Sequence, residues 1–331
     1  IPSPREGEIR VAYVFATRSG VNDSAIAPDS AGGSNRIVQG ASTLGVSGYP
    51  FRIFVRPSGL AIYALAGIEN RTGGEFIPYL MGVRRDLVTA PNQELPGTDI
   101  FADIPLDHEL QVLLGDLPER TPEGPERFTV RASIDLGGEG LIVREFDGNS
   151  MDVIERSGGG EAFRFFAQPA FLGNLADARY RIEVGWYSRN KSEPPYTTTL
   201  RHGIEQSGAP VLFDDLLGIP QAVSPAVGDR VPEDRILRWK ADGEPPDLHV
   251  VTIVGGDGVP AWRQIIPGGQ RQTPIPDLSE LSELQDIAGG TISWRVYAVK
   301  IPAFLYDGFL YAYLSDRYWT HESCNEFNMR K

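Results

Sequence analysis

The clearest structural signal in this sequence is the segment YRIEVGWY, residues 180–187. Its bulky apolar side chains fall on every second position, namely Tyr180, Ile182, Val184 and Trp186. Because successive side chains of a β-strand point to opposite faces of a sheet, this alternation predicts a half-buried strand. We therefore expect strands, and not helices, to decide the fold.

Runs of similar character lie N-terminal to this segment, at residues 9–16, 60–66, 128–134 and 163–165. The 37 glycines and 26 prolines favour many turns between short elements. The best helical spacing, over Asp277–Ile287, is expected to form only one or two turns within a connection. These patterns predict an all-β fold made of tandem β-sandwich domains, immunoglobulin-like or transthyretin-like in type.

A weak internal repeat bears on the domain organisation. The segment that ends at Gly67 resembles the one that ends at Gly185, an offset of 185 − 67 = 118 residues. Asp99 and Asp215 follow these segments at an offset of 215 − 99 = 116 residues. The two offsets indicate two copies of one sandwich, although chance similarity between ordinary strands would also explain them.

The repeat predicts a first domain at residues 1–104 and a second at residues 105–217. The junction Leu217–Pro220 has the composition of a linker. Residues 218–331 are therefore predicted to form a third β-sandwich.

Three segments of the third domain carry a family resemblance. Trp239 ends the run Ile236–Trp239, the apolar run Leu248–Val254 follows, and Gly290–Val299 contains Trp-Arg-Val with an alanine two residues later. Over about residues 218–331 the chain resembles a fibronectin type III-like domain. That resemblance implies a binding and spacer module. By its alternation with Ile292 and Val296, Trp294 is predicted to lie in the core close to Trp239.

The first domain carries a looser resemblance. Pro57-Ser58-Gly59 precedes the run Leu60–Ala66, Pro91-Asn92 suits a turn, and Gly97–Ile100 suits a last strand. These segments resemble the transthyretin-like, or carboxypeptidase regulatory-like, sandwich, whose usual opening is not clear in the first 45 residues. Members of that family mostly serve as accessory or surface-presentation modules.

The charge balance and cysteine content restrict the setting. The formal net charge of 31 − 44 = −13 argues against nucleic-acid binding and against an anionic membrane surface. No apolar run approaches 18 residues, so no transmembrane segment is expected in this chain. Cys324 is the single cysteine and is predicted to be a free thiol without a catalytic role. Few cysteines and an excess of arginine over lysine suit a bacterial protein that is secreted or held in the cell envelope. We expect it in the periplasm or on the outer surface, with a lipid anchor on a removed N-terminal segment as one means of attachment.

Sequence motifs for chemistry are scarce. The sequence has no nucleophile elbow, no zinc-binding His-Glu-x-x-His, no phosphate loop and no dinucleotide fingerprint. The segment Asp147–Asp152 lacks the glycine and the bidentate glutamate of a calcium loop, and His321–Cys324 offers few metal ligands. We therefore expect no catalytic residue, no metal site and no cofactor, and a protein that is not an enzyme.

The most unusual local feature is a group of aromatic side chains near the C-terminus. Phe304, Leu305 and Tyr306 follow one another in the connection Ile301–Asp307, after a strong strand signal. Three adjacent large side chains cannot all face one core, so this connection is predicted to contact a partner or a neighbouring sandwich. Phe309, with Tyr311 and Tyr313, is expected to face the core from a last strand.

Three functions remain open from the sequence. The first is a non-enzymatic bacterial scaffold or adhesion protein that binds a protein partner or self-assembles. The second is a glycan-binding accessory protein, and the third is a hydrolase with an acidic active site. A flat apolar patch or an unpaired sheet edge would favour the first, a shallow aromatic groove the second, and a pocket with two facing carboxylates the third.

Overall fold

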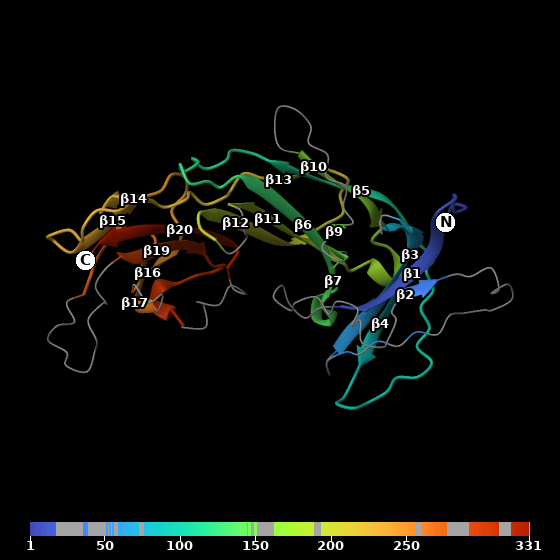
Figure 1. Ribbon diagram of the computed structural model, residues 1–331. Helices are drawn as coiled ribbons and strands as arrows, with labels where there is room; N and C mark the ends of the chain where they lie inside the picture. Colours follow the sequence, from blue (N-terminus) through green and yellow to red (C-terminus); the bar gives the residue numbers. More distant parts are fainter. Residues whose placement is uncertain are drawn as a thin grey trace. The chain divides into compact units, whose positions relative to one another are not determined.

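The fold is all-β, as predicted (Figure 1). The computed structural model describes residues 1–17, 36–38, 51, 53, 55, 59–72, 76–143, 145–146, 149–150, 162–188, 193–255, 260–276, 291–310 and 319–330. Over these residues the chain forms strands and three short 3₁₀ turns, with no α-helix. None of the helices in the described residues has the length and apolar character to cross a membrane. The expected helical turns at Asp277–Ile287 lie outside the described residues.

The contacts of the chain group it into two compact units. Unit 1 contains Ile1–Leu113, Ala132–Ile182 and His202–Leu212, and unit 2 contains Leu114–Arg131, Glu183–Arg201 and Phe213–Lys331. The chain changes unit five times, within strands β5 (Ile104–Leu114), β6 (Arg127–Asp135), β11 (Arg179–Tyr187), β12 (Tyr196–Ile204) and β13 (Val211–Phe213). The domain boundaries near residues 104 and 217 stay a prediction.

Unit 1 is built around a sheet of order β10-β5-β4-β3-β1-β2. Its strands are β1 (Glu8–Ala16), β2 (Arg36–Val38), β3 (Gly59–Asn70), β4 (Phe76–Val88), β5 (Ile104–Leu114) and β10 (Ala162–Pro169), and β13 (Val211–Phe213) also pairs with β5. Strand β3 is buried from Leu60 to Glu69, so both of its faces are covered. The predicted strands at residues 9–16 and 60–66 are therefore present.

One strand expected in unit 1 is absent. Residues 91–92 form the predicted turn, but Gly97–Ile100, expected to be a strand, contains a turn and no strand. Gly97 has φ +72°, in the left-handed region that suits glycine. Next to it, the chain at Phe101 packs against Gly82, where a Cβ would come within 2.2 Å of the Phe101 carbonyl oxygen. The prediction was wrong because this backbone crosses the face of β4 before β5 begins at Ile104.

Two short elements complete unit 1. Ile142 in β7 (Leu141–Ile142) pairs with Ile134 in β6, and β8 (Glu145–Phe146) pairs with β9 (Asn149–Ser150). The remaining residues of the Asp147–Asp152 segment lie outside the described part of the chain.

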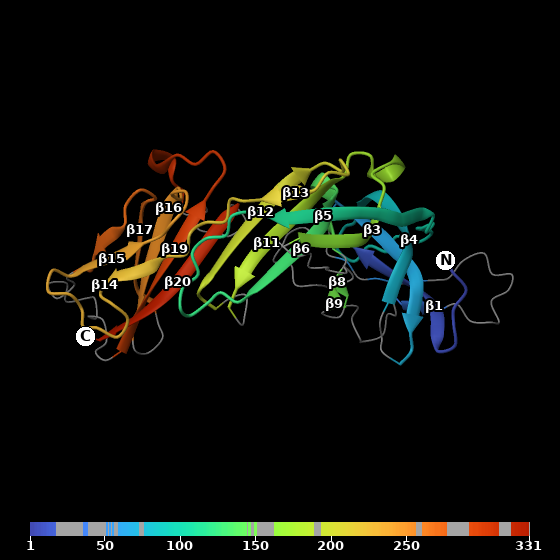
Figure 2. The ribbon, with the colours of Figure 1, turned by 90° about the horizontal axis from the view of Figure 1, so that it is seen from above.

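Unit 2 contains two sheets that enclose one core. The shorter sheet has the order β14-β15-β18, from β14 (Gln221–Ser224), β15 (Ile236–Lys240) and β18 (Gln272–Pro274). The longer sheet has the order β17-β16-β19-β20 and continues within this unit into β12, β11 and β6. Its first four strands are β17 (Pro260–Pro267), β16 (Leu248–Val254), β19 (Thr291–Lys300) and β20 (His321–Arg330). Figure 2 shows β16, β19, β20, β12 and β11 following one another in this order.

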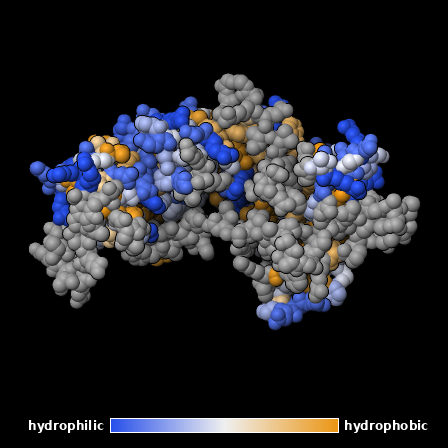
Figure 3. Space-filling view, viewed as in Figure 1, coloured by the Kyte–Doolittle hydropathy of each residue, from blue (hydrophilic) through white to orange (hydrophobic). Residues whose placement is uncertain are grey.

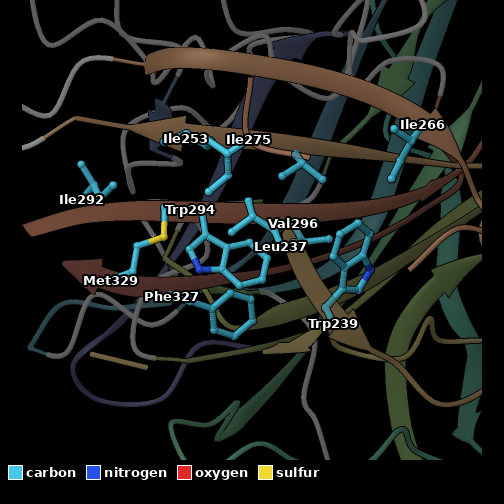
Figure 4. Close-up of a cluster of buried hydrophobic side chains, with 11 residues drawn as sticks. Leu237, Trp239, Ile253, Ile266, Ile275, Ile292, Trp294, Val296, Phe327 and Met329 are labelled. Carbon is cyan, nitrogen blue, oxygen red and sulfur yellow. The ribbon is translucent and has the colours of Figure 1, made fainter. Parts of the chain in front are cut away.

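The core between the two sheets is apolar and centred on Trp294 (Figure 4). Trp294 is fully buried, and its ring centroid lies 4.7 Å from that of Phe327 and 6.4 Å from that of Trp239. The predicted place of Trp294 in the core, close to Trp239, is therefore confirmed. The other members of the inner core are Leu237, Val251, Ile253, Ile266, Ile275, Ile292, Val296 and Met329.

The last strand differs from the expectation. The last strand expected from the sequence runs through Tyr311 and Tyr313, but Cys324 also lies in a strand, β20, and is fully buried. Burial raises the pKa of the Cys324 thiol, with a further contribution from Glu322. The sequence did not predict β20 because residues 321–326, HESCNE, have no apolar alternation.

Candidate binding site

An apolar cluster covers the face of the longer sheet opposite to the inner core. Leu248, Val250, Val299 and Ile301 are buried there, and this set is called the outer cluster below. Because side chains alternate along a strand, β16 directs Leu248 and Val250 to this face and Val251 and Ile253 to the inner core. Strand β16 is consequently buried on both faces.

The connection 301–310 covers the outer cluster. Phe304, Phe309 and Trp319 are partly buried against it. The ring centroid of Phe304 lies 6.4 Å from that of Phe309, at an interplanar angle of 72° that suits edge-to-face packing. Phe304, predicted as a contact residue, therefore packs largely on its own unit.

Hydrogen bonds hold the connection in place. The Ile301 backbone N–H donates to Asp247 Oδ2 at 2.8 Å, and the Phe309 N–H donates to the Tyr306 carbonyl at 3.1 Å. The Tyr306 hydroxyl donates to the carbonyl of Ile265 at 3.2 Å. Ile265 belongs to β17, which is the last strand at this end of the sheet. The connection is thus fixed both to the sheet face and to its edge.

Three large side chains of this connection are exposed at the surface. Leu305 is 75% exposed, Leu310 58% and Tyr306 42%. Leu305 and Tyr306 were predicted as contact residues and stand at the surface, whereas Leu310 was not predicted. Residues 309–310 are not in a strand, so the expected strand through Phe309 is wrong at that point. Tyr311 and Tyr313 lie outside the described residues.

A group of charged side chains lies where β20 begins. Asp215 Oδ2 lies 2.7 Å from Arg201 Nη2 and 3.1 Å from His321 Nε2. The Arg201 guanidinium also lies over the Phe213 ring, 4.5 Å from its centroid. Burial by itself would raise the pKa of Asp215, but the interactions with His321 and Arg201 outweigh it and lower the pKa to about 2. Asp215 is therefore ionised at neutral pH.

Buried polar side chains continue this group along β12 and β20. Thr197 Oγ1 donates to the Leu217 carbonyl at 2.9 Å, Ser323 Oγ to the Gly218 carbonyl at 2.8 Å, and Asn325 Nδ2 to the Pro220 carbonyl at 2.8 Å. The segment 217–220, expected to be a linker, is instead buried, with Leu217 2% and Ile219 0% exposed. Each polar side chain satisfies a backbone carbonyl that burial has removed from water.

The geometry of His321 indicates a structural role. Its Nε2 faces Asp215, and its Nδ1 lies 3.0 Å from Thr320 Oγ1. A carboxylate, an imidazole and a hydroxyl in a row can activate a nucleophile, but the Thr320 hydroxyl also lies 3.4 Å from the Lys300 carbonyl. The series of contacts from Asp215 through His321 to Thr320 therefore ends at a backbone carbonyl, that of Lys300.

The His321–Cys324 segment does not converge on one point. It forms strand residues, so His321 and Ser323 face one side of the sheet while Glu322 and Cys324 face the other. Among the residues that the structure describes, no three His, Cys, Asp or Glu side chains gather in a way that could hold a metal ion.

Comparison with known proteins adds no relative: no family model, no curated protein and no solved structure matches this chain.

Proposed function

We propose that this chain is a non-enzymatic scaffold or adhesion protein that binds a protein partner, or a second copy of itself, through Leu305, Tyr306 and Leu310. The observation that carries the proposal is the contrast within one connection. Phe304 and Phe309 anchor it to the sheet, while the three neighbouring side chains are 42–75% exposed. Large apolar side chains held rigidly at the surface are typical of contact sites, because little conformational entropy is lost on binding.

The strand order of unit 2 supports the proposed module type. A three-stranded sheet β14-β15-β18 faces the four strands β17-β16-β19-β20. This is the arrangement expected of a fibronectin type III-like domain, a family of binding and spacer modules. A transthyretin-like origin for the N-terminal part remains part of the proposal.

We propose the cell envelope or the secreted fraction as the place of action, with a lipid anchor on a removed N-terminal segment as one means of attachment. The low cysteine content is compatible with this setting, because the single cysteine, Cys324, is buried and forms no disulfide.

The proposal is tested with the full chain by sedimentation velocity over a range of concentrations up to about 100 µM. We expect reversible self-association that Leu305→Ser with Leu310→Ser abolishes. Both side chains are exposed, so the fold should change in stability by less than about 0.5 kcal/mol per site. Val227→Ser is the matched control, because Val227 is 59% exposed in the same unit and outside the connection.

If the chain stays monomeric, a photo-crosslinking residue at position 305 tests for a different partner in intact cells. Crosslinks from position 305 that are absent from position 227 would support the proposal. A monomeric chain without crosslinks, or self-association that the double variant leaves unchanged, would refute it.

A further inference from the structure

Strand β17 forms one edge of the longer sheet of unit 2. It pairs with β16 from Pro260 to Pro267, and among the strands that the structure describes it has no partner on its other side. The edge strand of a sheet carries backbone N–H and C=O groups that no neighbouring strand satisfies, so it can accept a further strand. In Figure 3 the surface around β17 is a mixture of hydrophobic and hydrophilic side chains.

The hydrogen bonds at the end of β17 show which of its residues face the edge. The Gly268 N–H donates to the Asp247 carbonyl at 2.9 Å, in register with the pairing of β16 and β17. Residues of an antiparallel strand bond alternately to one side and to the other. Arg263 and Ile265, an odd number of positions before Gly268, therefore direct their N–H and C=O groups away from β16. The hydrogen bond from the Tyr306 hydroxyl to the Ile265 carbonyl agrees with this direction.

The part of this edge that can bond another strand is short. Pro260 and Pro267, at the two ends of β17, have no N–H group to donate. The groups that remain between them are the N–H and C=O of Arg263 and Ile265. The Ile265 carbonyl accepts the Tyr306 hydroxyl, but a carbonyl oxygen has a second lone pair for another donor. An edge of this length suits a short extended segment in one defined register.

The two outward-facing residues are complementary to a second copy of the same strand. When two β17 strands run antiparallel with Arg263 of one opposite Ile265 of the other, both outward-facing residues of each strand find a partner. Each of these pairs exchanges two backbone hydrogen bonds. Moving one strand by two residues would place Arg263 opposite Arg263, which sets like charges against each other, or opposite Pro267, which has no N–H. The pairing of Arg263 with Ile265 is therefore the favoured register.

The side chains along this edge suit the same partner. Trp262 and Ile266 pack on the inner core, whereas Ile265 packs on the outer cluster. Because side chains alternate along a strand, the exposed Arg263 shares the outer face with Ile265, and the Tyr306 hydroxyl bonds at this position. In the paired strands, the aliphatic stem of Arg263 from one copy would lie beside Ile265 and Tyr306 of the other, where its guanidinium can contact the tyrosine ring.

We propose that a second copy of this chain adds its β17 to this edge, in antiparallel pairing with Arg263 opposite Ile265. The inference rests on the proposed function, because specific protein interfaces bury more than about 1,000 Å² and two short paired strands bury less. Leu305, Tyr306 and Leu310 of both copies supply the remaining contact area. The product is a symmetric dimer in which the longer sheet continues from one copy into the other.

The first test measures amide hydrogen exchange of the full chain, resolved by residue, at about 1 µM and about 100 µM. In the single chain the Arg263 and Ile265 amides have no strand to bond and should exchange quickly. In the dimer they are hydrogen-bonded, so their exchange should be at least about threefold slower at the higher concentration. The Ile266 amide bonds toward β16 in both states and is the internal control, which should not change.

Arg263→Pro and Arg263→Ala form a matched pair for the second test. Proline removes the outward N–H and leaves the bonds between β16 and β17 in place, because edge strands tolerate proline where the N–H faces solvent. Alanine removes only the side chain and keeps the N–H. Arg263→Pro should weaken dimerisation, measured by sedimentation velocity, at least about tenfold more than Arg263→Ala. Thermal unfolding checks the fold, and if Arg263→Pro unfolds, the amide exchange of the unaltered chain decides.

Equal weakening by the two variants would overturn the strand pairing, as would exchange of the Arg263 and Ile265 amides that does not depend on concentration. A chain that stays monomeric at about 100 µM would also overturn it, while crosslinks from position 305 would still decide the proposed function. If Leu305→Ser with Leu310→Ser abolishes association but the dimer leaves the two amides unprotected, the proposed function stands and the strand pairing is refuted.

Discussion

Five of the ten residues of strand β20 are buried, and its two halves are stabilised in different ways. The half from Phe327 to Met329 enters the inner core, where its apolar side chains pack against Trp294. The half from His321 to Asn325 buries polar side chains that bond the segment 217–220. The stability of the first half depends on close packing of apolar surface. The stability of the second half depends on each buried hydrogen-bond donor having an acceptor.

This difference changes what a substitution should do. In the apolar half, a truncated side chain loses contact area and leaves a cavity. In the polar half, it leaves a buried carbonyl without a donor, which costs free energy even though little volume is lost.

The largest effect is expected at the centre of the inner core. Trp294→Ala should lower the free energy of unfolding by about 3–5 kcal/mol, because a fully buried indole is removed. Urea denaturation followed by tryptophan fluorescence or circular dichroism measures the loss. Trp262→Ala is the control: Trp262 lies on the edge strand β17 and is only partly buried, so its loss should be smaller. A loss below about 1 kcal/mol at Trp294 would contradict the assignment of this core.

The next effect is expected from a titratable side chain inside the same core. His249 is fully buried beside Trp239, with ring centroids 5.2 Å apart. Burial, with a smaller contribution from Arg271, lowers the pKa of His249 from 6.5 to about 3. The folded state thus keeps His249 neutral where the unfolded state binds a proton, so stability is lost as the pH falls from 6.5 to 3.

Between pH 7 and pH 4 this loss should amount to about 3 kcal/mol. Carboxyl groups titrate over the same range, so the measured quantity is the difference between wild type and His249→Gln at each pH. The pH dependence of the wild type should be steeper than that of the variant by about that amount. Parallel curves would show that His249 is protonated in the folded state.

A smaller effect is expected in the polar half of β20. Asn325→Ala should lower the free energy of unfolding by about 2 kcal/mol, because the buried Pro220 carbonyl loses its donor. Asn328→Ala is the matched control, since it changes the same residue type on the same strand at an exposed position. Chemical denaturation of the two variants side by side measures the difference. Equal losses would mean that the buried hydrogen bond contributes nothing beyond strand formation.

Part of the fold could be predicted from residue patterns alone. The alternation at residues 180–187 predicted a strand, and Tyr180, Ile182, Val184 and Trp186 are all buried in β11. The alternation around Trp294 predicted its burial for the same reason. In both cases the period of two between apolar residues reflects a sheet with one face covered, which is a local property of the strand.

The sequence-based prediction failed where the buried residues are polar and where a close backbone contact displaces a strand. Residues 321–326 are buried or half-buried although they show no apolar alternation. Ser323 and Asn325 bond to backbone carbonyls that lie 105 residues earlier in the chain. Gly97–Ile100 was expected to be a strand, but close packing on Gly82 carries that backbone across a sheet face. Neither contact leaves a periodic signal in the sequence.

The candidate contact residues were also only partly predictable from the sequence. The sequence indicated that Phe304, Leu305 and Tyr306 could not all be buried in one core, but it could not say which would be anchored. The structure decides this, because the outer cluster takes Phe304 and leaves Leu305 and Tyr306 exposed.

The amino-acid sequence by itself determined that this chain folds from strands, because side-chain alternation and frequent turn residues are local properties of the chain. Only the tertiary structure decided which polar side chains are buried and which loop is anchored to the sheet. Those outcomes depend on hydrogen bonds and charges between residues far apart in sequence, and such pairings arise only when the sheets pack together.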